Sequence, residues 1–381
     1  MAKGKETGLI TVRSFASRRD VMKAMALGTA TAGLGLSGSL ARAQSATSIN
    51  MVCWQGYDDA FKAGSFMEDN GYEINPTYIG SNDEILTKIT AGGRGTIDIV
   101  TPYMGYVPLM VAADMLEPID ESSVPNLKNV LPVFRNDPNI VVDGKLYAAP
   151  FTWGAAPMLY DPEHFGDTAP SSWRVLETPE LEGKFGFSDD PIGNITIAAI
   201  VATDAEVATE LTEEQLNTAI DYLIMLKGKS RLLATSWGEL ADAMARGEIV
   251  ATFSGWETMK KFAADKGKTV EFTYPEEGTF AWLDNVCIVK DAPNLEADLN
   301  LANHVLSVES QRMVGEEMLQ GIVSQAAIDA LTPAAAKLYP YGDMDAFGKS
   351  ATFFPFPPLE DRDGLMSIGR WNEEYERFKS A

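Results

Sequence analysis

From residue 48 onwards, short apolar or β-branched runs alternate with longer segments in which apolar residues recur at helical spacing. The short runs predict strands, and the longer segments predict amphipathic helices. The expected strands cover residues 48–54, 72–78, 96–101, 145–151, 185–188, 249–253, 270–274 and 282–289. The expected helices cover residues 58–69, 83–91, 106–113, 194–202, 213–227, 237–246, 258–266, 295–308, 310–319 and about 364–379. This alternation is typical of α/β folds with parallel strands, and 381 residues suffice for two lobes or one large α/β unit.

Several of these segments have boundary residues of the expected kind. Thr212-Glu213-Glu214-Gln215 matches a capping box, and Ser81-Asn82-Asp83-Glu84 offers a cap followed by first-turn acids. Gly92-Gly93-Arg94-Gly95 follows a predicted helix, so we expect it to end that helix. No composition shift marks a single linker, so two lobes would be joined by several crossings of the chain.

The first 43 residues differ from the rest of the chain. They are basic, then apolar and small, and they end in Ala41-Arg42-Ala43, which is the order of a signal peptide. The basic part, Ser17 to Lys23 with the pair Arg18-Arg19, resembles the twin-arginine export motif. We therefore expect the twin-arginine export machinery as a partner, cleavage near Ala43 and a periplasmic location. The alternative is a single anchoring helix, although the Gly- and Ala-rich stretch is a poor membrane span.

The chain is strongly acidic, with 31 Lys and Arg, 54 Asp and Glu and a formal charge of −23. Residues 1–43 carry seven of the basic and two of the acidic residues, so the chain without them has a charge of −28. This composition excludes a nucleic-acid partner bound through phosphates, which needs a basic face. It suits a cationic partner, and general surface solubility is the alternative explanation.

The residues needed for common catalytic and metal centres are scarce. Cys53 and Cys287 lie in apolar runs and are expected to be buried and unpaired, and the chain has only His164 and His304. There is no P-loop, strand-linked GxGxxG, HExxH or GxSxG motif. The sequence therefore predicts no metal, no cofactor and no enzymatic activity.

Aromatic residues, often with a carboxylate nearby, occur repeatedly where predicted strands begin or end. These stretches are Trp54 to Tyr57, Pro102-Tyr103, Ser188 to Asp190, Phe253 to Glu257 and Phe280 to Asp284. Ligands of α/β sheets bind beyond the carboxyl ends of strands, and aromatic faces with carboxylates suit an organic ammonium. The alternative is that these aromatics pack in the core or at a hinge.

At these residues the chain resembles the polyamine-binding (spermidine/putrescine) family of periplasmic receptors that feed ABC importers. The most specific stretches are Trp54 to Tyr57, Gly80 to Glu84, Ile97 to Pro102, Leu146 to Gly154, Ser172-Trp173, Leu181 to Lys184 and Trp282 to Asp284. The resemblance implies an α/β, two-lobed, type II-like binding-protein fold with hinge strands. Lobe one would comprise residues 44–150 and about 285–335, lobe two residues 151–284, and residues 336–381 would be a C-terminal helical segment packing on the lobes.

The resemblance also implies a ligand site. Carried over by position, the ligand-binding residues would be Trp54, Gln55, Tyr57, Tyr103, Asp190, Phe253, Trp282 and Asp284. Trp256, Glu257 and Ser324 are further candidates, and exposure to solvent is the alternative expectation for Glu257. Phe253 stands where the family commonly has Trp, and Gly56, Gly193 and Ile322 stand where it usually has two acids and a Tyr. The missing acids favour a diamine or modified amine over a longer polycation.

The leading hypothesis is thus a monomeric receptor that captures a small organic cation and delivers it to an ABC permease. One alternative is a receptor for a non-polyamine solute, such as an opine, an amino-acid derivative or an organic acid. An exported enzyme is the other alternative, and no motif supports it.

Overall fold

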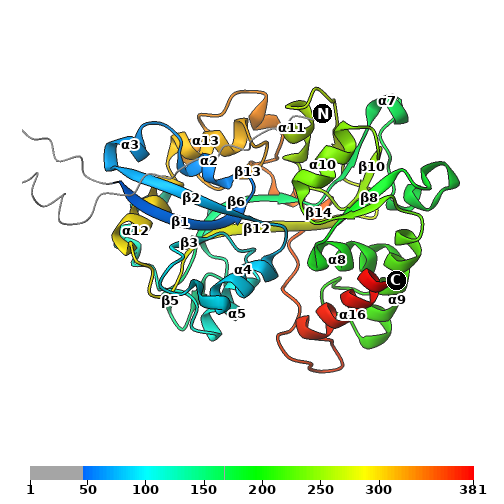
Figure 1. Cartoon of the computed structure of the whole chain (residues 1–381), viewed down its shortest axis with the longest axis horizontal. Helices are drawn as coiled ribbons and strands as arrows, with labels where there is room; N and C mark the ends of the chain where they lie inside the picture. Colours follow the sequence, from blue (N-terminus) through cyan, green and yellow to red (C-terminus); the bar gives the residue numbers. More distant parts are fainter. Residues whose placement is uncertain (1–45, 167) are drawn as a thin grey trace, which may run out of the picture. The chain divides into compact units, whose positions relative to one another are not determined.

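The structure of the chain is a computed structural model, which describes residues 46–166 and 168–381. It is an α/β structure built on two main sheets (Figure 1). The predicted export segment, residues 1–43, lies outside the described residues. Within the described ranges, no helix combines the length and hydrophobicity that crossing a bilayer requires.

The larger sheet has seven strands in the order β13-β6-β12-β3-β1-β2, with β14 pairing with β12. Its strands are β1 (Thr47–Trp54), β2 (Tyr72–Ile79), β3 (Ile99–Val100), β6 (Ala149–Ala155), β12 (Thr279–Ile288), β13 (Gly321–Ile322) and β14 (Ala351–Thr352). β1 runs parallel to β2 and β3, whereas β12 is antiparallel to β3 and β6. β6 and β12 are buried along their whole length, so both faces of the sheet are covered there.

The smaller sheet has five strands in the order β11-β7-β10-β8-β9. Its strands are β7 (Met158–Tyr160), β8 (Phe185–Ser188), β9 (Leu232–Ala234), β10 (Ala251–Phe253) and β11 (Glu271–Thr273). β8 is parallel to both β9 and β10, and β7 is antiparallel to β10 and β11. A two-stranded sheet of β4 (Val141–Val142) and β5 (Lys145–Leu146) stands apart.

The helices connect and cover these strands. The α-helices are α2 (Tyr57–Phe61), α3 (Phe66–Asn70), α4 (Asn82–Lys88), α5 (Tyr106–Ala112), α6 (Pro132–Arg135), α7 (Pro162–Phe165), α8 (Pro191–Ala202), α9 (Glu213–Lys227), α10 (Trp237–Ala245), α11 (Met259–Ala264), α12 (Leu295–His304), α13 (Val308–Glu316), α14 (Gln325–Ile328), α15 (Met344–Phe347) and α16 (Ile368–Ser380). The π turn Ile89–Gly93 extends α4, and short 3₁₀ turns cover Glu121–Ser123, Pro125–Asn129, Trp173–Glu177, Pro179–Leu181 and Ala335–Lys337. α16 lies beside α8 and α9, next to the five-stranded sheet (Figure 1).

Local boundary chemistry explains where several helices begin and end. The Thr212–Gln215 capping box is confirmed, since the Thr212 side chain accepts a bond from the Gln215 N–H and the Gln215 side chain bonds back. The helix predicted over 58–69 is instead two helices, α2 and α3, with left-handed Gly64 (φ 69°) between them. The Ser81 side chain makes no cap bond; instead Glu84 accepts a bond from the Gly80 N–H at 3.0 Å.

The chain passes between the two sheets several times. β6 of the larger sheet leads into β7 of the smaller one within three residues, and β11 returns to β12 through Tyr274–Gly278. A third link runs from β14 through the Pro-rich segment 353–358 to α16. The predicted several crossings are therefore present, while the residue boundaries proposed for the two lobes stay a prediction.

Candidate functional site

Two loops of the larger sheet, after β1 and after β3, form an aromatic wall with strand β12. β1 ends at Trp54, and left-handed Gly56 (φ 90°) turns the chain so that Tyr57 begins α2. The Tyr57 hydroxyl donates a 2.6 Å hydrogen bond to Oδ2 of Asp284 on β12. Tyr103, just after β3, forms an isolated bridge with Asp284, and the Met104 N–H bonds the Leu283 carbonyl at 2.8 Å. Pairing with β12 thus fixes Tyr103 and Asp284 side by side.

The smaller sheet contributes the opposite wall through the ends of β8 and β10. Asp190 caps α8, and its side chain accepts a bond from the Gly193 N–H at 3.2 Å. Ser254 follows β10 with φ 57°, an unusual conformation for a residue with a side chain, and directs the chain into Gly255-Trp256. Strain of this kind is most common where a binding or catalytic site requires it.

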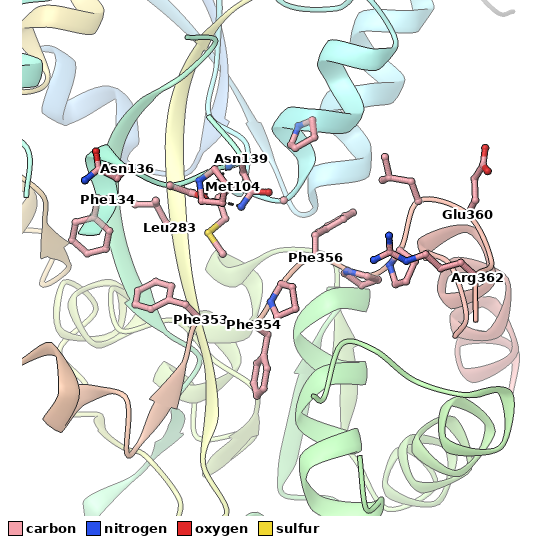
Figure 2. A pocket seen from close by; sticks show the side chains of 18 of the residues that line it. Met104, Phe134, Asn136, Asn139, Leu283, Phe353, Phe354, Phe356, Glu360 and Arg362 are labelled. Atoms are coloured by element: carbon pink, nitrogen blue, oxygen red, sulfur yellow. Dashed lines mark hydrogen bonds between the residues drawn. The ribbon is translucent and has the colours of Figure 1, made fainter. Parts of the chain in front are cut away.

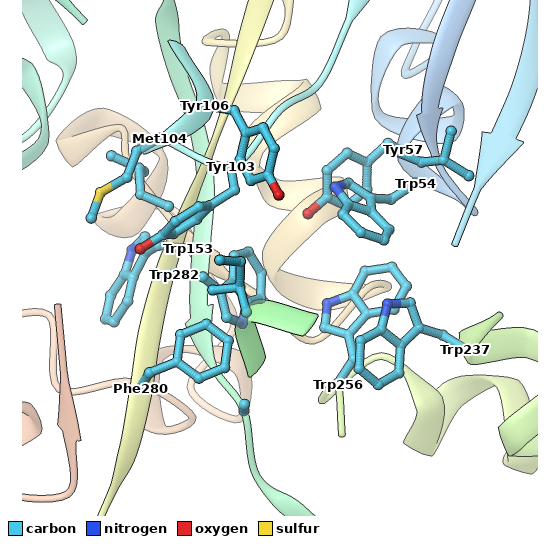
Figure 3. Packing of buried hydrophobic residues seen from close by; sticks show 14 of the residues in the cluster. Trp54, Tyr57, Tyr103, Met104, Tyr106, Trp153, Trp237, Trp256, Phe280 and Trp282 are labelled. Carbon is cyan, nitrogen blue, oxygen red and sulfur yellow. The ribbon is translucent and has the colours of Figure 1, made fainter. Parts of the chain in front are cut away.

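Between these walls lies a cavity, which we call the aromatic cavity. The described residues that line it come from both sheets and from the loops and helices that follow their strands. None of these residues is Lys, Arg or His. They are Trp54, Tyr57, Asn82, Tyr103, Ala156, Asp190, Ile192, Trp237, Ser254, Gly255, Trp256, Phe280, Trp282 and Asp284. Figure 3 shows Trp54 and Tyr57 facing Trp237 and Trp256 across this space, with Phe280 to one side. Only about 60 Å³ is free inside, so the walls are nearly in contact.

The two carboxylates of the cavity lie in an environment that disfavours their charge. Burial raises the pKa of Asp284 to about 7, against the bond from Tyr57, and the nearby charge of Asp190 adds to the rise. Burial likewise raises the pKa of Asp190 to about 7, although the Gly193 N–H opposes the shift. Because no basic side chain compensates them, both acids are poised to gain from a cation in the cavity.

The stacking face of Trp282 is held by backbone contacts. Its indole Nε1 donates to the Ala155 carbonyl at 3.1 Å, across the β6–β12 pair. The ring lies against Gly154, where a Cβ would come within 2.5 Å of the ring atom Cζ2. A glycine is therefore required beneath this ring, and the ring has little freedom to turn.

Seven predicted residues line the aromatic cavity, and four do not. Trp54, Tyr57, Tyr103, Asp190, Trp256, Trp282 and Asp284 line it. Phe253 is fully buried against Phe187 and Trp173 beneath the smaller sheet, so it offers no face to the cavity. Ser324 is fully buried beside Val130.

Gln55 and Glu257 lie just outside the cavity, in different settings. The Gln55 side chain packs on α10, where a Cβ on Gly238 would lie 2.5 Å from its Oε1. The expectation that Glu257 points to solvent is wrong: it is fully buried, because Ala155, Tyr274 and Tyr339 surround its carboxylate.

Sequence reasoning missed Ala156, Ile192 and Trp237 as cavity residues, and it named Asn82, Ser254, Gly255 and Phe280 only as parts of stretches. Trp237 begins α10 after the Ser236 cap, a position that reads as an ordinary amphipathic helix start. Asn82 accepts a bond from the Tyr103 N–H at 2.9 Å, which positions that loop. A serine before a glycine at a strand end was the one available signal for Ser254.

The two sheets also approach each other closely at the edge of the cavity. Gly80, after β2, lies against the carbonyl of Thr235, after β9, and a Cβ there would be 2.1 Å from that oxygen. The closed arrangement around the cavity therefore depends on a glycine at this contact.

A larger groove lies beyond β12. It has about 830 Å³ of free space and is lined by Met104, Phe134, Leu283 and the segment 353–362, as Figure 2 shows. Leu283 alternates with Trp282 and Asp284 along β12, so it points to the opposite face.

Because both perturbed carboxylates and the stacking faces converge on the aromatic cavity, we take the cavity as the candidate site. The described residues contain no cluster of His, Cys, Asp and Glu suited to a metal ion.

Comparisons with known proteins agree with this architecture. A family model described as "Bacterial extracellular solute-binding protein" matches residues 62–337. The putrescine-binding periplasmic protein SpuD of Pseudomonas aeruginosa is 26% identical over 349 residues, covering 86% of this chain and 94% of that protein.

Two solved structures share the fold at low sequence identity. A putative spermidine/putrescine ABC transporter protein from Listeria monocytogenes has a TM-score of 0.74 at 21% identity, covering 88% of this chain and 99% of that one. The binding protein MotA from Agrobacterium tumefaciens, solved with glucopine, has a TM-score of 0.67 at 18% identity, covering 87% and 100%. These two show the two-lobed binding-protein fold.

Proposed function

The chain belongs to the family of bacterial extracellular solute-binding proteins, and we propose that it captures a small diamine-like cation between its lobes for an ABC importer. Membership of this family removes the exported-enzyme alternative. The observation that carries the ligand class is the pair of acids, Asp190 and Asp284, in an aromatic cavity without a basic side chain. Their raised pKa values mean that a bound ammonium supplies the missing counter-charge.

The aromatic faces suit the same ligand. An ammonium above the face of an indole is attracted by the ring quadrupole, most strongly when water is excluded. Trp282 on β12, whose ring lies against Gly154, and Trp54 at the end of β1 provide the faces that we propose to contact the ligand. Tyr57 and Tyr103 would orient Asp284 and close the site at its larger-sheet side.

The ligand is proposed to be short. The free space is small, and the acids that the polyamine-binding family usually has at Gly56 and Gly193 are missing. Gly193 leaves no room for a side chain, because a Cβ there would lie 2.5 Å from Oδ2 of Asp190. A cation with three or four ammonium groups would lack partners for its further charges. The curated relative named for putrescine supports a diamine.

We further propose that the receptor acts in the periplasm as a monomer and presents its closed form to an ABC permease in the inner membrane. The Arg18-Arg19 segment supports export through the twin-arginine machinery, with cleavage near Ala43. Cys53 and Cys287 are buried and unpaired, as expected, which suits a protein that folds before it leaves a reducing compartment.

A second candidate ligand is a cation that also carries a hydrogen-bond acceptor, such as an opine or another amino-acid derivative. Two polar groups of cavity residues favour it: the Trp54 indole N–H and the Ser254 hydroxyl are buried without a hydrogen-bond partner. A protonated diamine offers donors only, so it leaves the indole N–H unpaired, whereas a ligand oxygen would accept from it.

A ligand panel tests both candidates. The protein without residues 1–43 is titrated by calorimetry and thermal shift with putrescine, cadaverine, spermidine, an opine and an uncharged diol of putrescine's length. Ligand binding to the folded state raises the melting temperature, and tight diamine binding with weaker spermidine binding is expected. Preference for the diol over every amine would refute the cationic site, while preference for the opine would select the second candidate.

A further inference from the structure

Glu257 is a buried acid at the point where the chain passes between the sheets. It follows Trp256 after β10, and its side chain has no exposure to solvent. Its Oε1 accepts hydrogen bonds from the Ala155 N–H at 2.8 Å and from the Tyr274 hydroxyl at 3.1 Å. The Tyr339 hydroxyl also interacts with the carboxylate. One carboxylate thus bonds the last residue of β6 and the residue following β11, which begin the two short crossings between the sheets.

The same carboxylate lies near the Trp282 ring, and both groups lie close to Gly154. A Cβ on Gly154 would lie 2.5 Å from Cζ2 of Trp282 and 3.0 Å from each oxygen of Glu257, so all three groups meet at Gly154. Ala155 connects them further, since its N–H binds Glu257 while its carbonyl binds the Trp282 indole N–H. A shift of Glu257 is therefore transmitted to the ring through the backbone of one residue, Ala155.

The charge of Glu257 also affects the pKa of a residue that lines the aromatic cavity. Tyr57, which lines the aromatic cavity and bonds Asp284, has a pKa raised mainly by burial and by Asp284, and the charge of Glu257 adds to it. Because opposite charges attract strongly where water is excluded, an ionised Glu257 beside the aromatic cavity favours a cation inside it.

We propose that Glu257 is a positioning residue of the ligand site, which fixes Trp282 through Ala155 and, when ionised, favours a cation in the aromatic cavity. This inference rests on the proposed function, because it assigns Glu257 a part in selecting the same ligand. Glu257 does not line the cavity, so it acts through Trp282 and through its electric field.

The titration of Glu257 provides a readout that a purely structural role would lack. Burial raises its pKa to about 7, against the bonds from Ala155 and Tyr274. The ionisable groups that interact with it are Tyr57, Tyr274 and Tyr339, all phenols, so no described cation holds it ionised. A cation arriving in the cavity lowers the pKa of Glu257, and a proton leaves the protein as the ligand binds.

The experiment compares wild type with Glu257→Gln by calorimetry with putrescine at pH 6, 7 and 8, in two buffers of different ionisation enthalpy. The amide keeps an acceptor for Ala155 and Tyr274 but carries no charge. We expect affinity at pH 8 to fall about tenfold, equivalent to about 1.4 kcal/mol. Proton release at pH 7 should fall by up to about half a proton, because a group with a pKa near 7 is half protonated there.

Asp298→Asn is the matched control. Asp298 is also fully buried, its oxygens have no partner and burial raises its pKa to about 8, but it lies on α12 and does not line the aromatic cavity. Its replacement should leave putrescine affinity and proton release unchanged. Equal affinity and equal proton release for wild type and Glu257→Gln would overturn the inference while the proposed function stands. If wild type binds no amine more tightly than the uncharged diol, the proposed function is wrong, and so is the proposed role of Glu257 in selecting a cation.

Tyr274→Phe tests the same proposal if Glu257→Gln does not fold. The substitution removes one donor to the ionised carboxylate, so the pKa of Glu257 rises further. The pH at which putrescine affinity is half its maximum should then move upward, by several tenths of a pH unit or more. An unchanged pH profile in a folded Tyr274→Phe variant would contradict the role proposed for the charge.

Discussion

Replacing Asp284 by Asn should make the empty protein more stable at alkaline pH while it weakens amine binding. Burial raises the pKa of Asp284 from 3.8 to about 7, and no basic side chain among the described residues of the cavity compensates its ionised form. Asn fills nearly the same space without that charge. The substitution therefore allows two effects to be measured separately. One is the destabilisation of the ligand-free fold by the buried charge, and the other is the contribution of that charge to amine binding.

The magnitude follows from the pKa difference. A rise from 3.8 to about 7 corresponds to about 4 kcal/mol of folding free energy lost once the group ionises in both states. Since Asp284 is only 6% exposed, solvent screening removes little of this. The Asn amide lacks a partner for its NH₂ group, and its bond with Tyr57 is weaker than that of the carboxylate, which together cost about 1–2 kcal/mol. A net gain of about 2 kcal/mol is expected at pH 8.

The sign depends on pH. A carboxyl group with a folded pKa above its unfolded value contributes stability below pH 4, and this contribution is lost between pH 4 and 7. The variant should therefore be more stable than wild type at pH 8, about equal near pH 5 and less stable at pH 4. Binding should weaken at least about 30-fold, because loss of one partner of a buried charge pair costs about 2–5 kcal/mol.

Urea denaturation at pH 8, 6 and 4 measures the first effect, and putrescine calorimetry at pH 8 measures the second. Glu296→Gln, which removes an exposed acid on α12, is the control and should change stability by less than about 0.5 kcal/mol. An Asp284→Asn protein that is destabilised at pH 8, or that binds putrescine as wild type does, would refute the reasoning.

Three further predictions concern the Trp282 ring, the contact between the lobes at Gly80, and the acid that the polyamine-binding family usually has at the position of Gly193. Trp282→Ala should weaken putrescine binding about 30-fold through loss of the stacking face, and should reduce the ligand-induced change in tryptophan fluorescence. Gly80→Ala should hold the lobes apart, because its Cβ would meet the Thr235 oxygen at 2.1 Å; about tenfold weaker binding and a larger radius of gyration with saturating ligand are expected. Gly193→Glu should lower the free energy of unfolding by about 1–3 kcal/mol and should not improve spermidine binding, because its Cβ would displace Asp190.

A matched control exists for the glycine substitutions. Gly228, at the end of α9, has φ −57° and would place a Cβ no closer than 3.5 Å to other atoms, so Gly228→Ala should be neutral. A Gly80→Ala protein that binds and scatters as wild type does would show that the lobes close differently when ligand is bound. Tighter spermidine binding by Gly193→Glu would show that the site has room for the family acid.

Elements with strong local signals were predictable from the sequence, and several of the short ones were not. The predicted bounds of α9 and β8 agree with the structure because a capping box and a bounded apolar run mark them. β7, β9, β13 and β14 have two or three residues each, too few to show an alternating pattern. Their pairing depends on neighbours distant in the sequence, which no local pattern records.

The residues of the candidate site likewise fall into those that the sequence predicted and those that it did not. Trp54 and Tyr103 were found because strand ends locate ligand sites in α/β folds, whereas Trp282 lies inside β12 and was indicated by the family resemblance. Phe253 was chosen beside Trp256, but the left-handed turn at Ser254 directs Trp256 into the cavity and leaves Phe253 in the core. The burial of Glu257 depends on which segments cover it, and those segments come from three separate parts of the chain.

The placement of β1 and α16 has a practical consequence. β1 starts at Thr47 in the seven-stranded sheet, whereas α16 extends to Ser380 beside the helices of the five-stranded sheet. Binding proteins of this kind close by hinge bending, so we expect the separation of these two positions to change when ligand binds. A pair of fluorophores attached beside Thr47 and Ser380 would convert ligand capture into an energy-transfer signal without altering the cavity. The chain is thereby suited to use as a sensor for its own ligand, and the same labelled protein could screen candidate solutes directly.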